Sequence, residues 1–228
     1  MIISHKHKFI FIKTHKTAGT SLEIALSKYC GEEDVITPIS EKDEQIRRNL
    51  GYRVAQNYII SFGNYIFFDW LKYIVTRKKR SYFNHIKAQK VKNFVGKRIW
   101  SEYYTFCFER NPYDKCISGY YWMKNNNNIP LEKYLLEKAH LFSDFSMYSN
   151  KKNKIILDDV FKYEDINKAL NIISQKIGLN EELNISKIKA KGSVRVDKEP
   201  YKKLISNDLK KHIDEVFSNE LDCFNYRF

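Results

Sequence analysis

The sequence predicts an α/β protein whose parallel β-sheet is flanked by helices on both faces. A short apolar run is twice followed by a polar turn and then by a segment of helical periodicity, and this strand-turn-helix order is typical of parallel sheets. The chain has 228 residues and is 43% hydrophobic, which is enough to bury the core of one domain. We therefore expect a single domain over residues 1–228.

The first strand-turn-helix unit lies in the N-terminal part of the chain. Residues 9–12 form an uninterrupted apolar run, Phe-Ile-Phe-Ile, which indicates a buried parallel strand. After a polar turn, Leu22 and Leu26 fall on one face of a helix predicted over residues 20–29. Gly31 lies just beyond that helix and favours its termination there.

The middle of the chain, residues 38–80, has a mainly helical pattern. Ser40 is followed three residues later by Asp43, which predicts the N-terminal cap of a helix. Residues 58–75 are rich in Ile, Phe, Tyr and Trp, but polar residues interrupt them, so we expect a buried or interfacial helix and not a membrane span. The basic run Arg-Lys-Lys-Arg at 77–80 closes the segment.

A second strand-turn-helix unit begins near residue 103. Residues 103–108 alternate as a strand does, and Pro112 then opens a helix that runs to about residue 124. The remaining elements follow from turn residues and helical periodicity. We expect a low-complexity loop at 125–128, helices over 130–139, 165–177 and 200–217, and a third strand over 154–157.

Charge and cysteine usage limit the classes of function. The chain has 40 Lys and Arg against 27 Asp and Glu, a formal charge of +13 that favours anionic ligands without selecting one. Its four cysteines show no metal-ligand spacing, so we interpret them as reduced core thiols of a cytosolic protein. The first strand is expected to begin near Lys8, which leaves no room for a signal peptide. We expect a soluble, cytoplasmic protein.

The turn at residues 13–21 has the features of an anion-binding loop. It joins a strand to a helix N-terminus, where backbone N–H groups and the helix dipole attract negative charge. A Walker A loop requires Gly-Lys-Ser/Thr at the start of the helix, whereas here Gly19 precedes Thr20 and Lys16 lies three residues upstream of that glycine. The sequence therefore favours phosphate binding but weakens the NTPase interpretation.

A second candidate phosphate site follows the second strand. Arg110 ends that strand, Asn111 and Pro112 begin the helix, and Ser118 follows Arg110 by eight residues. An arginine fork and a serine hydroxyl can bind the same phosphate group. The alternative is an ion pair between Arg110 and a neighbouring acid such as Asp114, with Ser118 as a small helix residue.

These two segments resemble the phosphate-binding motifs of the PAPS-dependent sulfotransferases, in particular the carbohydrate sulfotransferases. PAPS is 3′-phosphoadenosine 5′-phosphosulfate. The resemblance implies a P-loop-type, sulfotransferase-like fold and transfer of a sulfuryl group from PAPS to a hydroxyl acceptor, with release of PAP and without a metal. It assigns the 5′-phosphosulfate to Lys16, Thr17, Ala18, Gly19, Thr20 and Ser21, and the 3′-phosphate to Arg110 and Ser118.

The same resemblance suggests a catalytic base. Lys16 is expected to stabilise the leaving phosphate, and His85 is the first candidate to accept the proton of the acceptor hydroxyl, because the segment around it resembles a base-bearing segment of the family. His15 and Glu109 are the alternatives. A basic loop at 191–195 either closes over the 3′-phosphate or is simply solvated.

Several functional questions stay open at this level. The resemblance favours a carbohydrate acceptor, with the helical insertion at 41–100 contributing to its site. We expect no nucleic-acid partner and no stable membrane insertion, and the oligomeric state is open. The rival functions are a P-loop nucleotide kinase, which would require ATP and Mg²⁺, and a non-catalytic nucleic-acid-binding protein that uses the basic run at 77–80.

Overall fold

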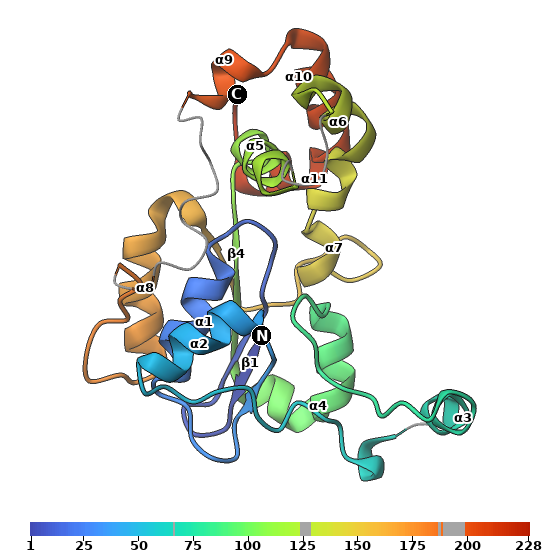
Figure 1. Ribbon diagram of the computed structural model, residues 1–228, viewed down its shortest axis with the longest axis vertical. Coiled ribbons are helices and arrows are strands. Elements are labelled where there is room, and N and C mark those ends of the chain that lie inside the picture. The colour runs from blue at the N-terminus through green and yellow to red at the C-terminus, as the bar shows by residue number, and fades with distance from the viewer. Residues whose placement is uncertain (66, 124–128, 187, 189–198) are drawn as a thin grey trace.

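The computed structural model describes residues 1–65, 67–123, 129–186, 188 and 199–228. Its centre is a five-stranded sheet in the order β3-β1-β2-β4-β5 (Figure 1). The strands are β1 (Ile2–Ser4), β2 (Phe9–Phe11), β3 (Val35–Ile36), β4 (Tyr104–Glu109) and β5 (Asp159–Lys162). The expected loop at 125–128 and the basic loop at 191–195 lie outside the described residues.

Helices surround this sheet and form a separate group beyond the end of β4 (Figure 1). The sheet-covering helices are α1 (Gly19–Ser27), α2 (Glu41–Asn49), α4 (Ala88–Glu102), α7 (Phe145–Tyr148) and α8 (Ile166–Lys176). The group beyond β4 comprises α5 (Pro112–Met123), α6 (Leu131–Lys138), α9 (Tyr201–Leu204), α10 (Asn207–Val216) and α11 (Ser218–Phe224). The other helices of the described residues are α3 (Phe67–Thr76) and the short 3-10 helices η1 (Phe62–Asn64), η3 (Ala139–Phe142) and η4 (Tyr163–Asp165).

The sheet is mixed, so the prediction of a wholly parallel sheet is wrong for two strands. β2, β4 and β5 pair in parallel, as expected, but β1 pairs antiparallel with both β2 and β3. The chain between Ser4 and Phe9 is a short turn, and a connection of that length can only join antiparallel strands. β1 and β3 span three and two residues, too few to show periodicity.

The two main strand-turn-helix units are confirmed close to their expected bounds, as β2 with α1 and β4 with α5. The third strand was placed too early in the sequence. Ile155 makes only an isolated bridge to Ser149, and the strand that joins the sheet is β5, which pairs with β4 from Asp159 onward. β5 is an edge strand in which charged residues flank Val160 and Phe161, so it lacks the apolar run by which a buried strand is identified.

The predicted helix over 200–217 is divided. It forms α9 and α10, separated by Ile205 and Ser206. The Ser206 side chain accepts a hydrogen bond from the backbone N–H of Leu209 and so caps a new helix. A local side-chain bond that competes with the helical backbone explains the break.

The middle segment is only partly helical. The cap at Ser40 is confirmed, because its side chain accepts a hydrogen bond from the backbone N–H of Asp43 at the start of α2. Most of the chain between α2 and η1 has no regular helix. Helix α3 leaves most of its apolar side chains exposed and stands apart from the sheet in Figure 1. Of the two alternatives expected within 58–75, a buried or an interfacial helix, the buried helix is therefore wrong.

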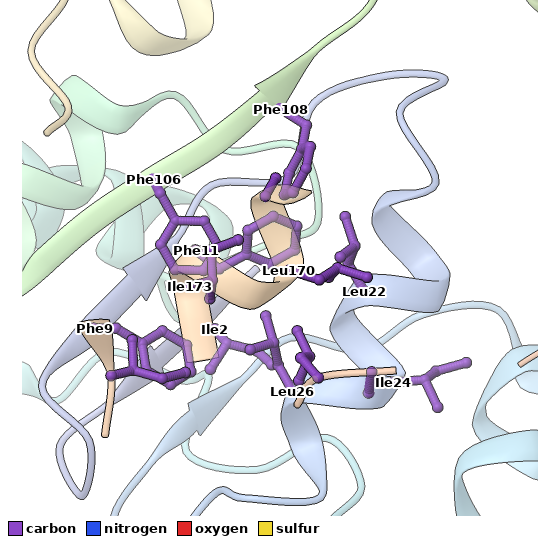
Figure 2. Packing of buried hydrophobic residues seen from close by; sticks show 14 of the residues in the cluster. Ile2, Phe9, Phe11, Leu22, Ile24, Leu26, Phe106, Phe108, Leu170 and Ile173 are labelled. Atoms are coloured by element: carbon purple, nitrogen blue, oxygen red, sulfur yellow. The ribbon is translucent and has the colours of Figure 1, made fainter. Parts of the chain in front are cut away.

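Both faces of the sheet are covered by helices, as predicted. Side chains alternate along β2, with Phe9 and Phe11 on one face and Ile10 and Ile12 on the other. Helices α1 and α8 cover the first face with the side chains shown in Figure 2, which include Leu22 and Leu26 of α1 and Leu170 and Ile173 of α8. Helices α4 and α7 cover the second face, where they contribute Val91, Phe145 and Tyr148.

Two further expectations concern thiols and membrane spans. Cys30, Cys107 and Cys116 are buried and unpaired, as expected, whereas Cys223 is unpaired but exposed and is therefore not a core thiol. Within the described ranges, the helices are all too short or too polar to cross a bilayer.

Candidate functional site

The loop between β2 and α1 has an alternating backbone conformation that is typical of anion-binding loops. Lys16 and Ala18 have positive φ angles of 59° and 56°, an unfavourable conformation for residues with a side chain. Alternation of such residues with ordinary ones turns successive N–H groups inward and forms an anion-binding nest. In the part of the chain that is described, no side chain caps α1 at Ala18, so the first N–H groups of that helix have no cap acceptor.

Contacts to neighbouring elements hold this loop in place. The Thr14 hydroxyl donates to the carbonyl of Phe108 in β4 at 2.5 Å, and it lies 2.9 Å from the hydroxyl of Thr17. A Cβ atom at Gly19 would lie 2.7 Å from Cγ of Lys13, so only glycine fits where the loop passes that side chain. The loop is therefore a supported cradle and not a mobile surface turn.

A buried charge cluster lies directly beneath the loop. Glu23 of α1 is fully buried and accepts hydrogen bonds from Lys13 Nζ at 2.9 Å and from the Thr37 hydroxyl at 3.0 Å. Burial alone would raise the pKa of Glu23, but the amino group of Met1, Lys13 and Arg47 outweigh burial and lower that pKa to about 2. The carboxylate thus stays ionised and fixes the stem of Lys13 under the loop.

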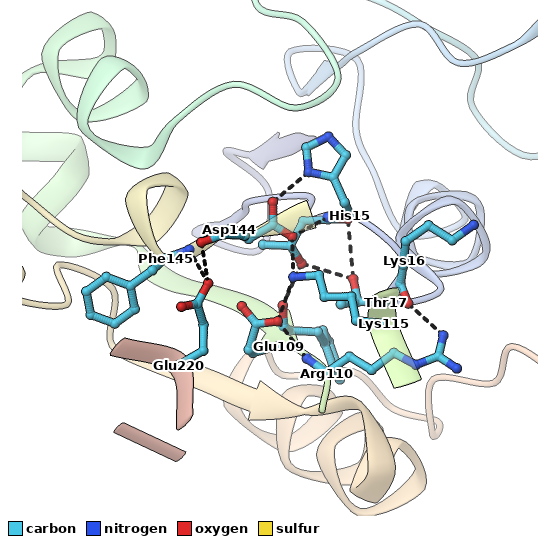
Figure 3. A network of polar contacts seen from close by, with 12 residues as sticks. His15, Lys16, Thr17, Glu109, Arg110, Lys115, Asp144, Phe145 and Glu220 are labelled. Atoms are coloured by element: carbon cyan, nitrogen blue, oxygen red, sulfur yellow. Dashed lines mark hydrogen bonds and ion pairs between the residues drawn. The ribbon is translucent and has the colours of Figure 1, made fainter. Parts of the chain in front are cut away.

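Arg110 joins the second motif to the first. Its Nη1 donates to the carbonyl oxygen of Lys16 at 2.9 Å, across 94 residues of sequence (Figure 3). Its Nε and Nη2 donate to Oδ2 of Asp114 at 2.9 and 2.5 Å, and the guanidinium lies over the Tyr163 ring at 4.5 Å. The ion pair that the alternative interpretation requires is therefore present, and it holds the arginine at the phosphate loop.

All the residues assigned to the two motifs line one open pocket of about 220 Å³. Ser118 enters it from α5, and Trp122 follows one turn later on the same helix. The Lys16 ammonium lies 5.2 Å from the centre of the Trp122 ring, which is a cation-π contact. The lining residues are Lys13 to Ser21, His85, Arg110, Ser118, Trp122 and Tyr163.

Two histidines stack at the side of this pocket. The rings of His15 and His85 have centroids 4.0 Å apart at an interplanar angle of 14°. His85 Nδ1 lies 3.0 Å from the carbonyl oxygen of Lys13, so that nitrogen carries the proton and Nε2 is left as an acceptor. Burial is the largest cause that lowers the pKa of His85, to about 4, and the nearby His15 and Lys13 add to it.

His15 is oriented by a buried carboxylate. The backbone N–H of His15 donates to Oδ2 of Asp144 at 2.7 Å, and its Nδ1 lies 2.5 Å from Oδ1. Asp144 is fully buried, and the Lys115 ammonium holds it from the other side at 2.6 Å (Figure 3). A carboxylate beside Nδ1 fixes the tautomer and the orientation of such a histidine.

Glu109 belongs to the support of the site and does not line the pocket. It is fully buried, and its carboxylate accepts hydrogen bonds from Lys115 Nζ at 2.7 Å, from the Tyr148 hydroxyl at 2.8 Å and from the backbone N–H of Arg110 at 2.8 Å. Burial raises the pKa of Glu109. Glu109 therefore positions the backbone of Arg110. It is a poor candidate for the base, because it does not reach the pocket.

Sequence reasoning missed several residues of this site. Trp122 could have been found, because it follows Ser118 by four residues on a predicted helix and so shares its face. Tyr163 follows β5, whose carboxyl end lies beside that of β4. No sequence signal indicated Asp144, which reaches His15 across 129 residues of sequence.

Comparison with known proteins identifies one relative of the chain, and the description of that relative names no activity. No protein-family model matches the sequence. A protein from Archaeoglobus fulgidus, described as an uncharacterized protein, is 34% identical over 104 residues, which cover 43% of this chain and 87% of the relative. The chain therefore belongs to the same family as this uncharacterized archaeal protein.

Proposed function

We propose that the protein is a PAPS-dependent sulfotransferase of the P-loop type, and that PAP is its nucleotide product. The observation that carries the proposal is the hydrogen bond from Arg110 to the carbonyl of Lys16, because it puts both phosphate motifs at one pocket. Two phosphate-binding motifs at one pocket suit a nucleotide donor that is phosphorylated at both its 3′ and 5′ positions. ATP has no 3′-phosphate to engage the second site.

The loop supplies the charge compensation that sulfuryl transfer requires. As the acceptor oxygen bonds to sulfur, the bond between sulfur and the bridging oxygen breaks, and negative charge collects on the 5′-phosphate of the leaving PAP. Lys16 and the N–H groups at the start of α1 line the pocket where that charge would develop. Positioning and charge compensation suffice for such a transfer, so we propose no metal.

Arg110 and Ser118 would bind the 3′-phosphate. Asp114 takes two hydrogen bonds from the guanidinium and so sets its plane, and Tyr163 supports it from the face. An arginine fixed in this way loses little conformational entropy when it binds an anion. Trp122 offers an aromatic face at the same pocket on which adenine can stack.

The base is one of two stacked imidazoles. His85 is neutral near pH 7, because its pKa is lowered to about 4, and its Nε2 can accept the acceptor proton. His15 is the second candidate, because it lines the same pocket and the buried Asp144 orients its ring.

The acceptor proposal rests on the resemblance. We propose a carbohydrate hydroxyl as acceptor, and the segment 41–100 as its binding region, because His85 lies within that segment and reaches the pocket. A cytoplasmic location is part of the same proposal.

Thermal unfolding in the presence of nucleotides tests the proposal. At a hundredfold excess over its dissociation constant, PAP should stabilise the fold by about 2.7 kcal/mol. For a chain of this length that raises the melting temperature by roughly 5–10 °C. Arg110→Ala should weaken PAP binding by about tenfold or more, and Arg110→Lys, which keeps the charge but loses the fork, should weaken it to a lesser extent.

Controls separate the rival functions. Arg98→Ala removes an exposed arginine from α4 and should leave the PAP response unchanged. Stabilisation by ATP with Mg²⁺ that equals or exceeds the effect of PAP would support the nucleotide kinase and refute the sulfotransferase. Binding of DNA or RNA with a steep salt dependence, together with no response to PAP, would support the nucleic-acid-binding protein.

A further inference from the structure

Helix α3 is an apolar helix that stands away from the body of the molecule (Figure 1). Its side chains include some of the most exposed apolar residues of the described chain, with Phe67 75% exposed, Phe68 72% and Val75 76%. Soluble proteins rarely leave a contiguous apolar surface uncovered unless something binds it. We define the α3 patch as Phe67, Phe68, Trp70, Leu71, Ile74 and Val75 with the neighbouring basic residues Lys72, Arg77, Lys78 and Lys79.

The orientation of α3 is fixed by contacts on its other side. Asp69 is 5% exposed and forms an ion pair with Arg80. The Tyr65 hydroxyl accepts a hydrogen bond from the backbone N–H of Arg80, and its ring contacts Tyr73 on the side opposite the patch. Trp70, at the edge of the patch, contacts Tyr65 and stacks on Phe62 of η1 at 5.3 Å. The helix therefore presents a defined apolar face to solvent and does not turn that face inward.

At 100° per residue, the six exposed apolar side chains of α3 fall within about half of the helix circumference. Lys72 lies at the border of that face. Arg77, Lys78 and Lys79 are exposed immediately after the helix. A row of apolar side chains bordered by cations has the pattern of a helix that lies in a membrane interface, with its apolar face among lipid tails and its cations at the headgroups.

The charge beside the α3 patch indicates what kind of membrane surface it can bind. Asp69 is the only acidic residue between 62 and 80, and its charge is matched by Arg80. The exposed charge beside the apolar face is thus wholly positive, which complements anionic lipid headgroups. The ten residues of α3 span too short a length to cross a bilayer, so the helix can lie on a membrane but cannot traverse it.

We propose that the α3 patch docks the protein reversibly on the surface of an anionic lipid bilayer. The apolar face inserts to headgroup depth, and the basic residues bind lipid phosphates and carboxylates. The patch and the nucleotide pocket share no lining residue, so the docking does not depend on which nucleotide the pocket binds.

Vesicle co-sedimentation with the full chain tests the proposal. We expect the protein to sediment with vesicles of mixed phosphatidylserine and phosphatidylcholine, to release as salt rises, and to remain in solution with phosphatidylcholine alone. Phe68→Ser combined with Val75→Ser should weaken partitioning by about tenfold or more. Lys78→Glu combined with Lys79→Glu should have a similar effect through charge.

Matched controls carry the same chemical changes on other surfaces. Leu136→Ser with Leu141→Ser removes two exposed apolar side chains near α6, and Lys202→Glu with Lys203→Glu reverses two exposed charges on α9. Both double variants should sediment as the wild type does. The thermal unfolding midpoint of each variant shows whether it is folded.

Three results would overturn the proposal. The first is no sedimentation of the folded protein with anionic vesicles. The second is equal sedimentation with neutral vesicles, which would remove the role of the cations. The third is concentration-dependent self-association, measured by analytical ultracentrifugation, that the α3 variants abolish while vesicle binding stays unchanged, because the patch would then be a contact between copies of the chain.

Discussion

Replacing Glu23 with glutamine tests the charge balance beneath the phosphate loop. The substitution keeps the volume of the side chain but removes a buried negative charge that faces Lys13 Nζ at 2.9 Å and an Arg47 nitrogen at 3.7 Å. Loss of one partner from a buried ion pair leaves the other charge uncompensated and costs about 3–5 kcal/mol. The lowering of the Glu23 pKa from 4.5 to about 2 corresponds to about 3 kcal/mol, which agrees with that range.

Thermal unfolding at neutral pH measures this loss. A destabilisation of about 3–5 kcal/mol should lower the thermal midpoint by roughly 6–20 °C for a chain of this length. Glu181→Gln is the matched control, since Glu181 is an exposed carboxylate that pairs with Lys28 near the other end of α1. That substitution should not measurably shift the midpoint.

The pH dependence gives a second test of the same carboxylate. Because the folded-state pKa of Glu23 is lowered, its contribution to stability is complete above pH 4.5 and is lost as the pH falls toward 2. The difference in stability between wild type and Glu23→Gln should therefore shrink across that interval. A Glu23→Gln variant within about 1 kcal/mol of wild type at pH 7 would refute the reasoning, since it would mean that the buried cations need no counter-charge.

Two other substitutions probe the site and its helical support. The pKa of His85 is lowered to about 4, chiefly by burial, so the unfolded chain binds more protons than the folded chain between pH 6.5 and 4. Acidification across that interval should therefore lower the free energy of unfolding by up to about 3 kcal/mol, and His85→Gln should abolish this loss in a urea-unfolding series. An unchanged acid slope in the variant would contradict this. A Cβ at Gly119 would overlap the Phe142 ring, so Gly119→Ala should destabilise by about 1–3 kcal/mol in the same assay, and a neutral effect would show that the ring can move.

Local sequence patterns predicted the elements that carry the site. The apolar run at residues 9–12 and the alternation at 103–108 were correctly identified as strands, because each strand has a clear pattern of its own. The pattern failed where an element is very short or where its surroundings decide its state. β1 and β3 are too short to show a period, and β5 has charged ends because it lies at the sheet edge.

Helix α3 shows a different limit of sequence reasoning. Its composition indicated an apolar helix, and a helix did form at Phe67–Thr76. Its burial could not be predicted, because a hydrophobic face is buried only if another element covers it. Only Phe62 of η1 stacks on Trp70 at the edge of that face among the described ring contacts, and six large apolar side chains of α3 remain exposed.

The sequence by itself determined which residue types lie near the two strand ends, because residue types and turn lengths there are local properties. It placed Lys16 in the turn before the first helix and Ser21 near the start of that helix, and it placed Arg110 at the end of a strand and Ser118 on the helix that follows. Only the tertiary structure decided that Arg110 reaches the carbonyl of Lys16 and that His85 stacks on His15. Those contacts join residues 70 to 94 positions apart, and their existence depends on the order of strands in the sheet, which no local pattern encodes.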